Sequence, residues 1–252
     1  PEQTVFEALL EAAKVHGARS RLVEDLKQEE YSYRDLLKMT LALGRLVARA
    51  TAPQGNDAPP RDDLPQPVGI LLPNLAATLG LVIGLPGFGR TPAMLNYTAG
   101  ADALQAAVEA AQIRHVVTSR AFVEQAKLEA RLAALRGVDI LYLEDLREGL
   151  TLADKLWLML WALPFPRAAP RLGSAESAAA ALFTSGSEGK PKGVVLSHRA
   201  LLANVAQIRA VVDFSVQDKI LNALPLFHSF GLTAGGLLPV LSGARVFLYP
   251  IP

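Results

Sequence analysis

The chain has 252 residues, of which 51% are hydrophobic and 19% are charged, and its formal net charge is +1. This composition is typical of a globular protein with a buried core and excludes a disordered segment. The charge is nearly balanced and no basic cluster is present, so nothing indicates a nucleic-acid partner. The chain contains no cysteine, which excludes disulfides and thiolate chemistry. Its four scattered histidines do not indicate a structural metal site.

The first fifty residues are predicted to form two helices separated by a hairpin. Residues 4–7, Thr-Val-Phe-Glu, form a capping-box pattern that predicts the start of a helix. Residues 21–25 and 29–31 predict two short strands, and Ser32 can cap a second helix. Residues 51–67 contain five prolines, so we expect a surface loop or a linker between subdomains there.

From residue 68 onward, apolar strands alternate with helical patterns. This alternation predicts an α/β fold of stacked, mostly parallel sheets flanked by helices. The expected strands are 68–72, 91–95, 115–118, 138–143, 178–183, 194–196, 219–223 and 244–248, and the expected helices are 76–83, 102–111, 121–135, 198–212 and 232–241. In the helix at 198–212, we expect a buried stripe of Leu201, Val205, Ile208 and Val212.

Residues 152–165 form an unusually apolar segment that includes both tryptophans of the chain. The apolar run is shorter than the roughly 20 residues that a helix needs to cross a bilayer. Two interpretations remain: a helix packed on the domain, which we favour, or an exposed apolar patch that contacts a membrane or a partner.

Residues 182–196 carry the densest group of candidate binding residues. Three glycines, three hydroxyl side chains and two lysines lie between an apolar run and a β-branched run. Glycines let the backbone approach a ligand, and successive N–H groups form a concavity for anions. A plain hairpin turn is the alternative, but the density of donors favours a phosphate-binding loop. A Walker loop is excluded, because Gly189-Lys190 is followed by Pro191.

Residues 184–193, Thr-Ser-Gly-Ser-Glu-Gly-Lys-Pro-Lys-Gly, resemble the signature T-S-G-[ST]-T-G-x-P-K-G of the acyl-adenylate-forming enzymes. The sequence departs from it at Glu188, where the family usually has threonine, and Lys190 falls on a variable position. The resemblance implies ATP and Mg²⁺ as cofactors, with no residue of this chain assigned to the metal. It assigns the ATP phosphates to Thr184, Ser185, Gly186, Ser187, Gly189, Lys192 and Gly193.

Two further segments support the same resemblance. Residues 224–231, Leu-Pro-Leu-Phe-His-Ser-Phe-Gly, are similar to the family's P-x-F-H-x-x-G element, which borders the acyl pocket. This similarity implies that His228 is a catalytic residue on the acyl-carboxylate side. Residues 89–100 and 243–250 resemble the synthetase part of bifunctional 2-acylglycerophosphoethanolamine acyltransferase/acyl-[acyl-carrier-protein] synthetases, as does Thr-Ser-Gly-Ser-Glu-Gly.

The resemblance implies an enzyme that activates a fatty acid with ATP and transfers it to the thiol of acyl carrier protein, in lysophospholipid reacylation. It places the parent protein at the cytoplasmic side of the bacterial inner membrane, whose surface it would contact. A long-chain acyl-CoA ligase, with coenzyme A as acceptor, is one alternative. A non-catalytic module that binds an acyl group or a nucleotide is the other.

The resemblance also implies a domain organisation. Residues 1–252 correspond to a fragment of the large adenylation domain, without the later motifs for adenine, ribose and the catalytic lysine. We therefore expect a soluble fragment that is inactive alone and self-associates through unpaired strand edges. About 68–212 are expected to form one α/β subdomain with the phosphate loop. About 1–50 and 216–252 are expected to belong to a second sheet, and 51–67 to link them.

Overall fold

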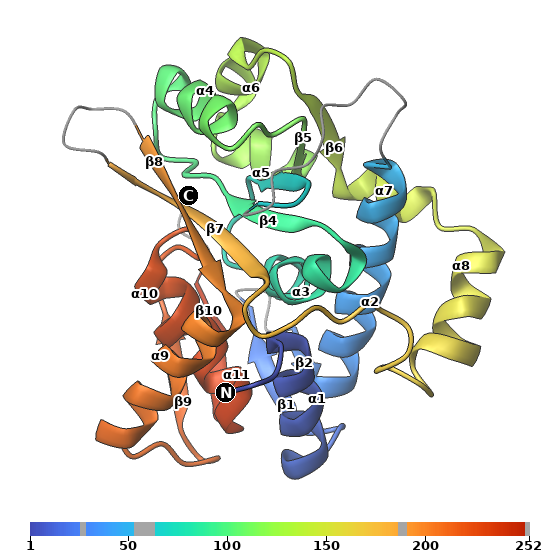
Figure 1. Cartoon of the computed structure of the whole chain (residues 1–252). Coiled ribbons are helices and arrows are strands. Elements are labelled where there is room, and N and C mark those ends of the chain that lie inside the picture. Colours follow the sequence, from blue (N-terminus) through green and yellow to red (C-terminus); the bar gives the residue numbers. More distant parts are fainter. Residues whose placement is uncertain (26–28, 53–63, 186–190, 250–252) are drawn as a thin grey trace.

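The computed structural model describes residues 1–25, 29–52, 64–185 and 191–249, and the chain folds around two sheets (Figure 1). Part of the predicted phosphate loop, namely Gly186, Ser187, Glu188, Gly189 and Lys190, lies outside the described residues. The same holds for most of the proline-rich segment, for the turn of the first hairpin and for the last three residues.

The N-terminal segment folds as its capping patterns predict. It consists of α1 (Val5–His16), β1 (Arg21–Glu24), β2 (Glu30–Ser32) and α2 (Tyr33–Ala50). The Thr4 hydroxyl accepts a hydrogen bond from the Glu7 N–H, and the Glu7 carboxylate accepts one from the Thr4 N–H at 2.8 Å. Ser32 and Asp35 form a second capping box at the start of α2. These reciprocal bonds satisfy N–H groups that a helix start leaves unpaired, so both predicted helix starts are confirmed.

The larger sheet has six strands in the order β6-β5-β3-β4-β7-β8. All neighbours in it are parallel except β7 and β8, which form an antiparallel pair. The strands are β3 (Pro67–Ile70), β4 (Thr91–Met94), β5 (His115–Thr118), β6 (Asp139–Tyr142), β7 (Ala178–Ser185) and β8 (Pro191–Ser197). The helical segments between them include α3 (Ala76–Gly84), η1 (Leu85–Phe88) and α4 (Ala101–Ala110).

The smaller sheet joins segments from opposite ends of the sequence, in the order β2-β1-β10-β9. Its later strands are β9 (Lys219–Asn222) and β10 (Arg245–Leu248), and β10 is parallel to both β1 and β9. The helical segments beside it are α9 (His198–Val211), α10 (Ser229–Leu232), η3 (Thr233–Leu237) and α11 (Leu238–Ser242). The predicted α/β fold with mostly parallel sheets flanked by helices is therefore confirmed.

Two local predictions are wrong, and one expected strand is shorter than predicted. The expected helix over 121–135 is two short helices, α5 (Arg120–Gln125) and α6 (Glu129–Ala134), because Lys127 between them has a left-handed φ of 53°. The expected strand over 138–143 ends at Tyr142, and Leu143 begins a further helix, α7 (Leu143–Glu148). Val212 does not extend the buried stripe of α9, because it lies beyond the helix end and is 43% exposed.

The apolar segment forms α8 (Leu152–Trp157), which continues into a π-helical turn, η2 (Leu158–Ala162). Leu158 and Ala162 are buried, so the segment is packed on the domain as predicted. Leu152, Leu160 and other large apolar side chains of the same segment are exposed. Both interpretations of the sequence thus describe part of what the structure shows.

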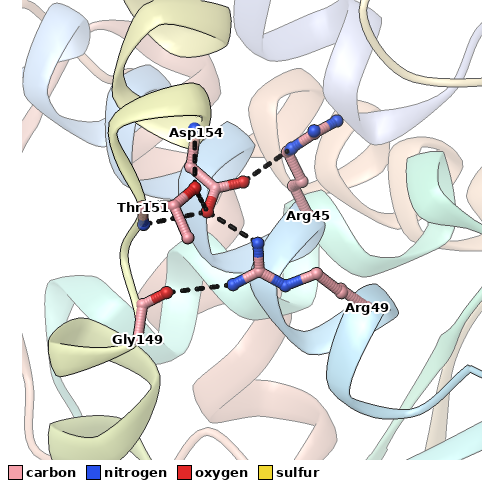
Figure 2. Close-up of polar contacts among 5 residues, drawn as sticks. All are labelled: Arg45, Arg49, Gly149, Thr151 and Asp154. Carbon is pink, nitrogen blue, oxygen red and sulfur yellow. Dashed lines mark hydrogen bonds and ion pairs between the residues drawn. The ribbon is translucent and has the colours of Figure 1, made fainter.

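Asp154 connects α8 to α2 through hydrogen bonds and ion pairs (Figure 2). Its carboxylate is buried and accepts hydrogen bonds from Arg49 Nη1 at 2.6 Å, from Arg45 Nε at 3.2 Å and from the Thr151 hydroxyl at 2.7 Å. The second Nη of Arg49 donates to the Gly149 carbonyl at 3.1 Å. Burial raises the pKa of Asp154, but the bonds from Thr151, Arg49 and Arg45 outweigh it and hold this pKa well below its usual range.

Replacing Asp154 with asparagine is expected to lower the free energy of unfolding by about 1–3 kcal/mol, because both arginines lose their buried counter-charge. The effect stays below that of a fully buried pair, since Arg45 and Arg49 are 39% and 50% exposed. Urea denaturation measures the change. Asp145→Asn is the matched control: its pair with Arg120 is exposed on both sides, so little change is expected. Equal effects of the two substitutions would contradict this account.

His198, at the first position of α9, is buried and contacts the first residue of α1. Its Nδ1 accepts a hydrogen bond from the Val5 N–H at 3.2 Å, which requires the neutral imidazole. Burial lowers the pKa of His198 to about 4, although the Glu7 carboxylate acts in the opposite direction. The neutral imidazole is therefore a hydrogen-bond acceptor at the contact between α1 and α9.

The stability of the fold is expected to fall as the pH drops from about 6.5 towards 4. In this window the unfolded chain protonates His198 and the folded chain does not, so the unfolded state gains up to about 3 kcal/mol. Urea denaturation at several pH values tests this. His198→Asn, which keeps an acceptor near the position of Nδ1, should flatten that part of the pH dependence. An unchanged slope in His198→Asn would contradict the assignment.

Candidate functional site

The carboxyl ends of β3, β4 and β7 lie at one edge of the larger sheet. These three strands are neighbours and run parallel, as the pairs Ile70–Met94 and Met94–Leu182 show. Asn74 follows β3, Tyr97 follows β4, and Thr184 lies at the end of β7. In open parallel sheets, ligands bind at this edge of the strands. The edge is therefore the candidate functional site.

Thr184 and Lys192 lie directly opposite each other on the antiparallel pair of β7 and β8. Both are exposed, and they stand on either side of residues 186–190. A hydroxyl and an ammonium group at these positions are suitable donors for phosphate oxygens. Gly193 is exposed opposite Phe183, and a Cβ there would lie 3.5 Å from the Phe183 ring, in ordinary contact. The structure thus gives no steric reason for a glycine at 193.

Of the other predicted phosphate ligands, Ser185 is the last residue of β7. Gly186, Ser187 and Gly189 lie outside the described residues, as does the departure at Glu188. Within the described part of the chain, no group of three or more His, Asp and Glu side chains is placed to hold a metal ion.

A series of aromatic contacts joins the second and third sequence motifs. Tyr97, from the 89–100 motif, contacts Phe227, from the 224–231 motif, edge to face with ring centroids 4.9 Å apart. The ring centroids of Phe122 and Tyr97 are 5.1 Å apart, and those of Phe227 and His228 are 4.7 Å apart. Burial raises the pKa of Tyr97 to about 12, so its phenol is neutral at physiological pH. The rings provide a rigid apolar wall behind His228.

His228 lies at the N-terminal cap position of α10, in the turn that follows β9. Its N–H donates to the Pro225 carbonyl at 3.0 Å, and its carbonyl accepts from the Leu232 N–H at 2.8 Å. The residue is exposed, whereas the neighbouring Phe227 is buried. The backbone is therefore fixed, and the imidazole is available to a ligand.

Two buried asparagines that the sequence motifs do not include position the turn bearing His228. Asn74 Oδ1 accepts from the Leu226 N–H at 2.9 Å, and its Nδ2 donates to the Leu224 carbonyl at 2.8 Å. Asn222 Nδ2 donates to the Gly231 carbonyl at 3.1 Å. Asn74 thus connects the edge of the larger sheet to a turn that follows a strand of the smaller one. Its position as a polar residue two places after the apolar run 68–72 was the signal available in the sequence.

Comparison with known proteins is consistent with this geometry. The model of the family described as "AMP-binding enzyme" matches residues 9–252. The medium-chain fatty-acid–CoA ligase of Escherichia coli K12 is 44% identical over 73 residues, which are 29% of this chain and 13% of that protein. The sulfoacetate–CoA ligase of Cupriavidus necator is 27% identical over 186 residues, 73% of this chain and 34% of that protein. The matches thus cover only 13% and 34% of the length of these two relatives.

Solved structures show the same fold. The complex of VinN with 3-methylaspartate has a TM-score of 0.76 and 21% sequence identity, and the match covers 99% of this chain and 63% of that one. Apo MatB from Rhodopseudomonas palustris has a TM-score of 0.74 and 19% identity, with 98% and 45% covered. No helix in the described part of the chain is long and apolar enough to cross a membrane.

Proposed function

The chain belongs to the AMP-binding enzyme family, and on that basis we propose that it holds the ATP phosphates in an enzyme that activates a fatty acid as its acyl-adenylate. One observation carries the proposal: Thr184 and Lys192 lie opposite each other on β7 and β8 and flank residues 186–190. This arrangement presents a hydroxyl and a cation where the sequence matches the phosphate-binding signature.

In acyl-adenylate formation, a carboxylate attacks the α-phosphate of ATP and expels pyrophosphate. Both reactants are anions, so the site has to offset the charge on the β- and γ-phosphates while the α-phosphate stays accessible. We assign this role to Lys192, to the Thr184 and Ser185 hydroxyls, and to the loop at 186–193. Mg²⁺, when bound, supplies further neutralisation of the phosphate charge.

We propose that His228 faces the acyl carboxylate and that the rings behind it border the acyl pocket. The contacts of Phe227 with Tyr97 and His228 support this role, because they place an exposed imidazole beside an apolar wall. The similarity to a medium-chain fatty-acid–CoA ligase supports a fatty acid as the substrate. We also propose two subdomains, about 68–212 and the pair 1–50 with 216–252, since the two sheets draw their strands from these ranges.

The thiol acceptor distinguishes two versions of this function. The resemblance at 89–100 and the Thr-Ser-Gly-Ser-Glu-Gly sequence support acyl carrier protein, in an enzyme of lysophospholipid reacylation at the cytoplasmic side of the bacterial inner membrane. The matches to fatty-acid and sulfoacetate CoA ligases support coenzyme A instead. We propose acyl carrier protein, with coenzyme A as the second candidate.

Competition between the two thiols tests this proposal in the complete protein. The enzyme is incubated with ATP, Mg²⁺ and a long-chain fatty acid, and mass spectrometry detects acyl-adenylate and both thioesters. The proposal predicts acyl-adenylate without a thiol, and acyl carrier protein as the preferred acceptor when both thiols are present. Preference for coenzyme A would identify an acyl-CoA ligase. Bound ATP without any adenylate would indicate a non-catalytic module.

A further inference from the structure

The segment 152–165, which contains α8 and η2, exposes several large apolar side chains. Their exposed fractions range from 47% for Trp161 to 72% for Leu152. Such a group on one surface segment marks a contact site, unlike scattered single residues. The set, which we call the α8 face, consists of Leu152, Leu156, Met159, Leu160, Trp161 and Phe165.

The α8 face is held in a fixed orientation. Asp154, Leu158 and Ala162 recur at four-residue intervals and are all buried, so the opposite side of the segment points outward. The Arg45 guanidinium lies over the Trp157 ring, 4.4 Å from its centroid, and also bonds Asp154. This anchoring keeps the apolar side chains outward, although they would be more stable in an apolar environment.

The charged residues that adjoin the α8 face in the sequence favour an anionic surface. Residues 152–172 contain three basic residues, Lys155, Arg167 and Arg171, and one acidic residue, Asp154. Asp154 is buried against Arg45 and Arg49, whereas the three basic side chains are exposed. Arg167 also pairs with the exposed Glu11, at 3.5 Å.

The arrangement of the segment favours a bilayer surface over a protein groove. Figure 1 shows α8 at the periphery of the molecule, away from β7 and β8. Trp161 and Phe165 lie side by side, with ring centroids 5.3 Å apart. Tryptophan and phenylalanine beside leucines, with lysine and arginine at the margin, are the composition of helices that lie in the membrane interface.

We propose that the α8 face binds the surface of a bilayer containing anionic lipid, with Trp161 and Phe165 in the headgroup region. This inference rests on the proposed function in one respect: a fatty-acid substrate partitions into bilayers, so an enzyme at the bilayer surface lies close to its supply. The exposed side chains of Lys155, Arg167 and Arg171 contact the anionic headgroups, and the apolar side chains leave water.

Tryptophan fluorescence tests this inference directly, because Trp157 and Trp161 are the two tryptophans of the chain. In the 252-residue chain carrying Trp157→Phe, Trp161 is the single reporter. Vesicles of phosphatidylglycerol and phosphatidylethanolamine are expected to shift its emission to shorter wavelength, and brominated lipid is expected to quench it. Vesicles of phosphatidylcholine alone, or high salt, should give weaker binding.

Leu156→Glu and Leu160→Glu are each expected to lower the partition coefficient for the anionic vesicles about tenfold or more. Val15→Glu is the matched control, because Val15 is 76% exposed on α1 and lies outside the α8 face. Circular dichroism establishes that each variant is folded. A charge at α8 that changes binding no more than the charge at Val15 would overturn the proposal.

Two other results would also overturn it. One is the absence of binding to anionic vesicles. The other is self-association of the chain that hides Trp161 and is abolished by Leu160→Glu, which would identify a second copy as the occupant of the face. Vesicle binding by the chain, together with the absence of acyl-adenylate formation by the complete protein, would leave this inference standing and refute the proposed function instead.

Discussion

Replacing Lys192 with alanine is expected to lower kcat/KM for ATP about 100-fold in the complete protein. Lys192 is exposed on β8 directly opposite Thr184, where its ammonium group can neutralise phosphate charge. Removing one preorganised donor of an oxyanion hole costs about 10²–10³ in rate, and Lys192 would act on developing charge in a comparable way. Steady-state kinetics with varied ATP and saturating fatty acid measures the change.

Lys190→Ala is the matched control for this experiment. Lys190 has the same charge and lies two positions away, but it falls on a variable position of the signature, so a loss of less than about tenfold is expected. Equal losses in the two variants would show that the segment acts only through its overall positive charge. An unchanged rate in Lys192→Ala would remove Lys192 from the phosphate site.

Replacing Gly231 with alanine is expected to lower the free energy of unfolding by about 3 kcal/mol. A Cβ at this position would lie 2.2 Å from the Pro225 carbonyl oxygen and 2.8 Å from that of Leu224. Both obstacles are backbone atoms, and Asn74 holds the Leu224 carbonyl in place at 2.8 Å. The clash can be relieved only by moving the turn that bears His228. Activity with fatty acid is therefore expected to fall together with stability.

Gly100→Ala provides the comparison for Gly231→Ala. A Cβ at Gly100, at the start of α4, meets no atom within 4 Å, so only the modest cost of alanine at a helix cap is expected. Urea denaturation and activity of both variants test the difference. If Gly231→Ala is as stable and active as Gly100→Ala, the turn does not depend on this close approach.

Local sequence signals predict most of the helices and strands, because capping and the alternation of apolar side chains depend on residues that are close in the sequence. The capping boxes at Thr4 and Ser32 determine where two helices begin. The break at Lys127 carries no such signal, since neither glycine nor proline marks its left-handed φ. Whether the α8 segment was buried or exposed depended on contacts with α2, which no pattern within residues 152–165 contains.

The candidate site could be predicted in its parts but not in its assembly. The residues around Lys192 and His228 were identified by their motifs, and their roles remain predictions. The pairing of Tyr97 with Phe227 joins residues from different sheet regions, and no periodicity reports such a contact. The position of Asn74 after a predicted strand does not by itself mark it as part of the site, because its three side-chain hydrogen bonds are made to residues 222–226, far away in the sequence.

The central claim is that this chain binds ATP in order to activate a carboxylic acid. The most direct measurement is the exchange of radiolabelled pyrophosphate into ATP by the complete protein, with and without a fatty acid. We expect exchange only when the fatty acid is present. Labelled pyrophosphate enters ATP when it attacks the acyl-adenylate, and the acyl-adenylate forms only from the fatty acid. Tight ATP binding with no exchange in the presence of any fatty acid would contradict the claim.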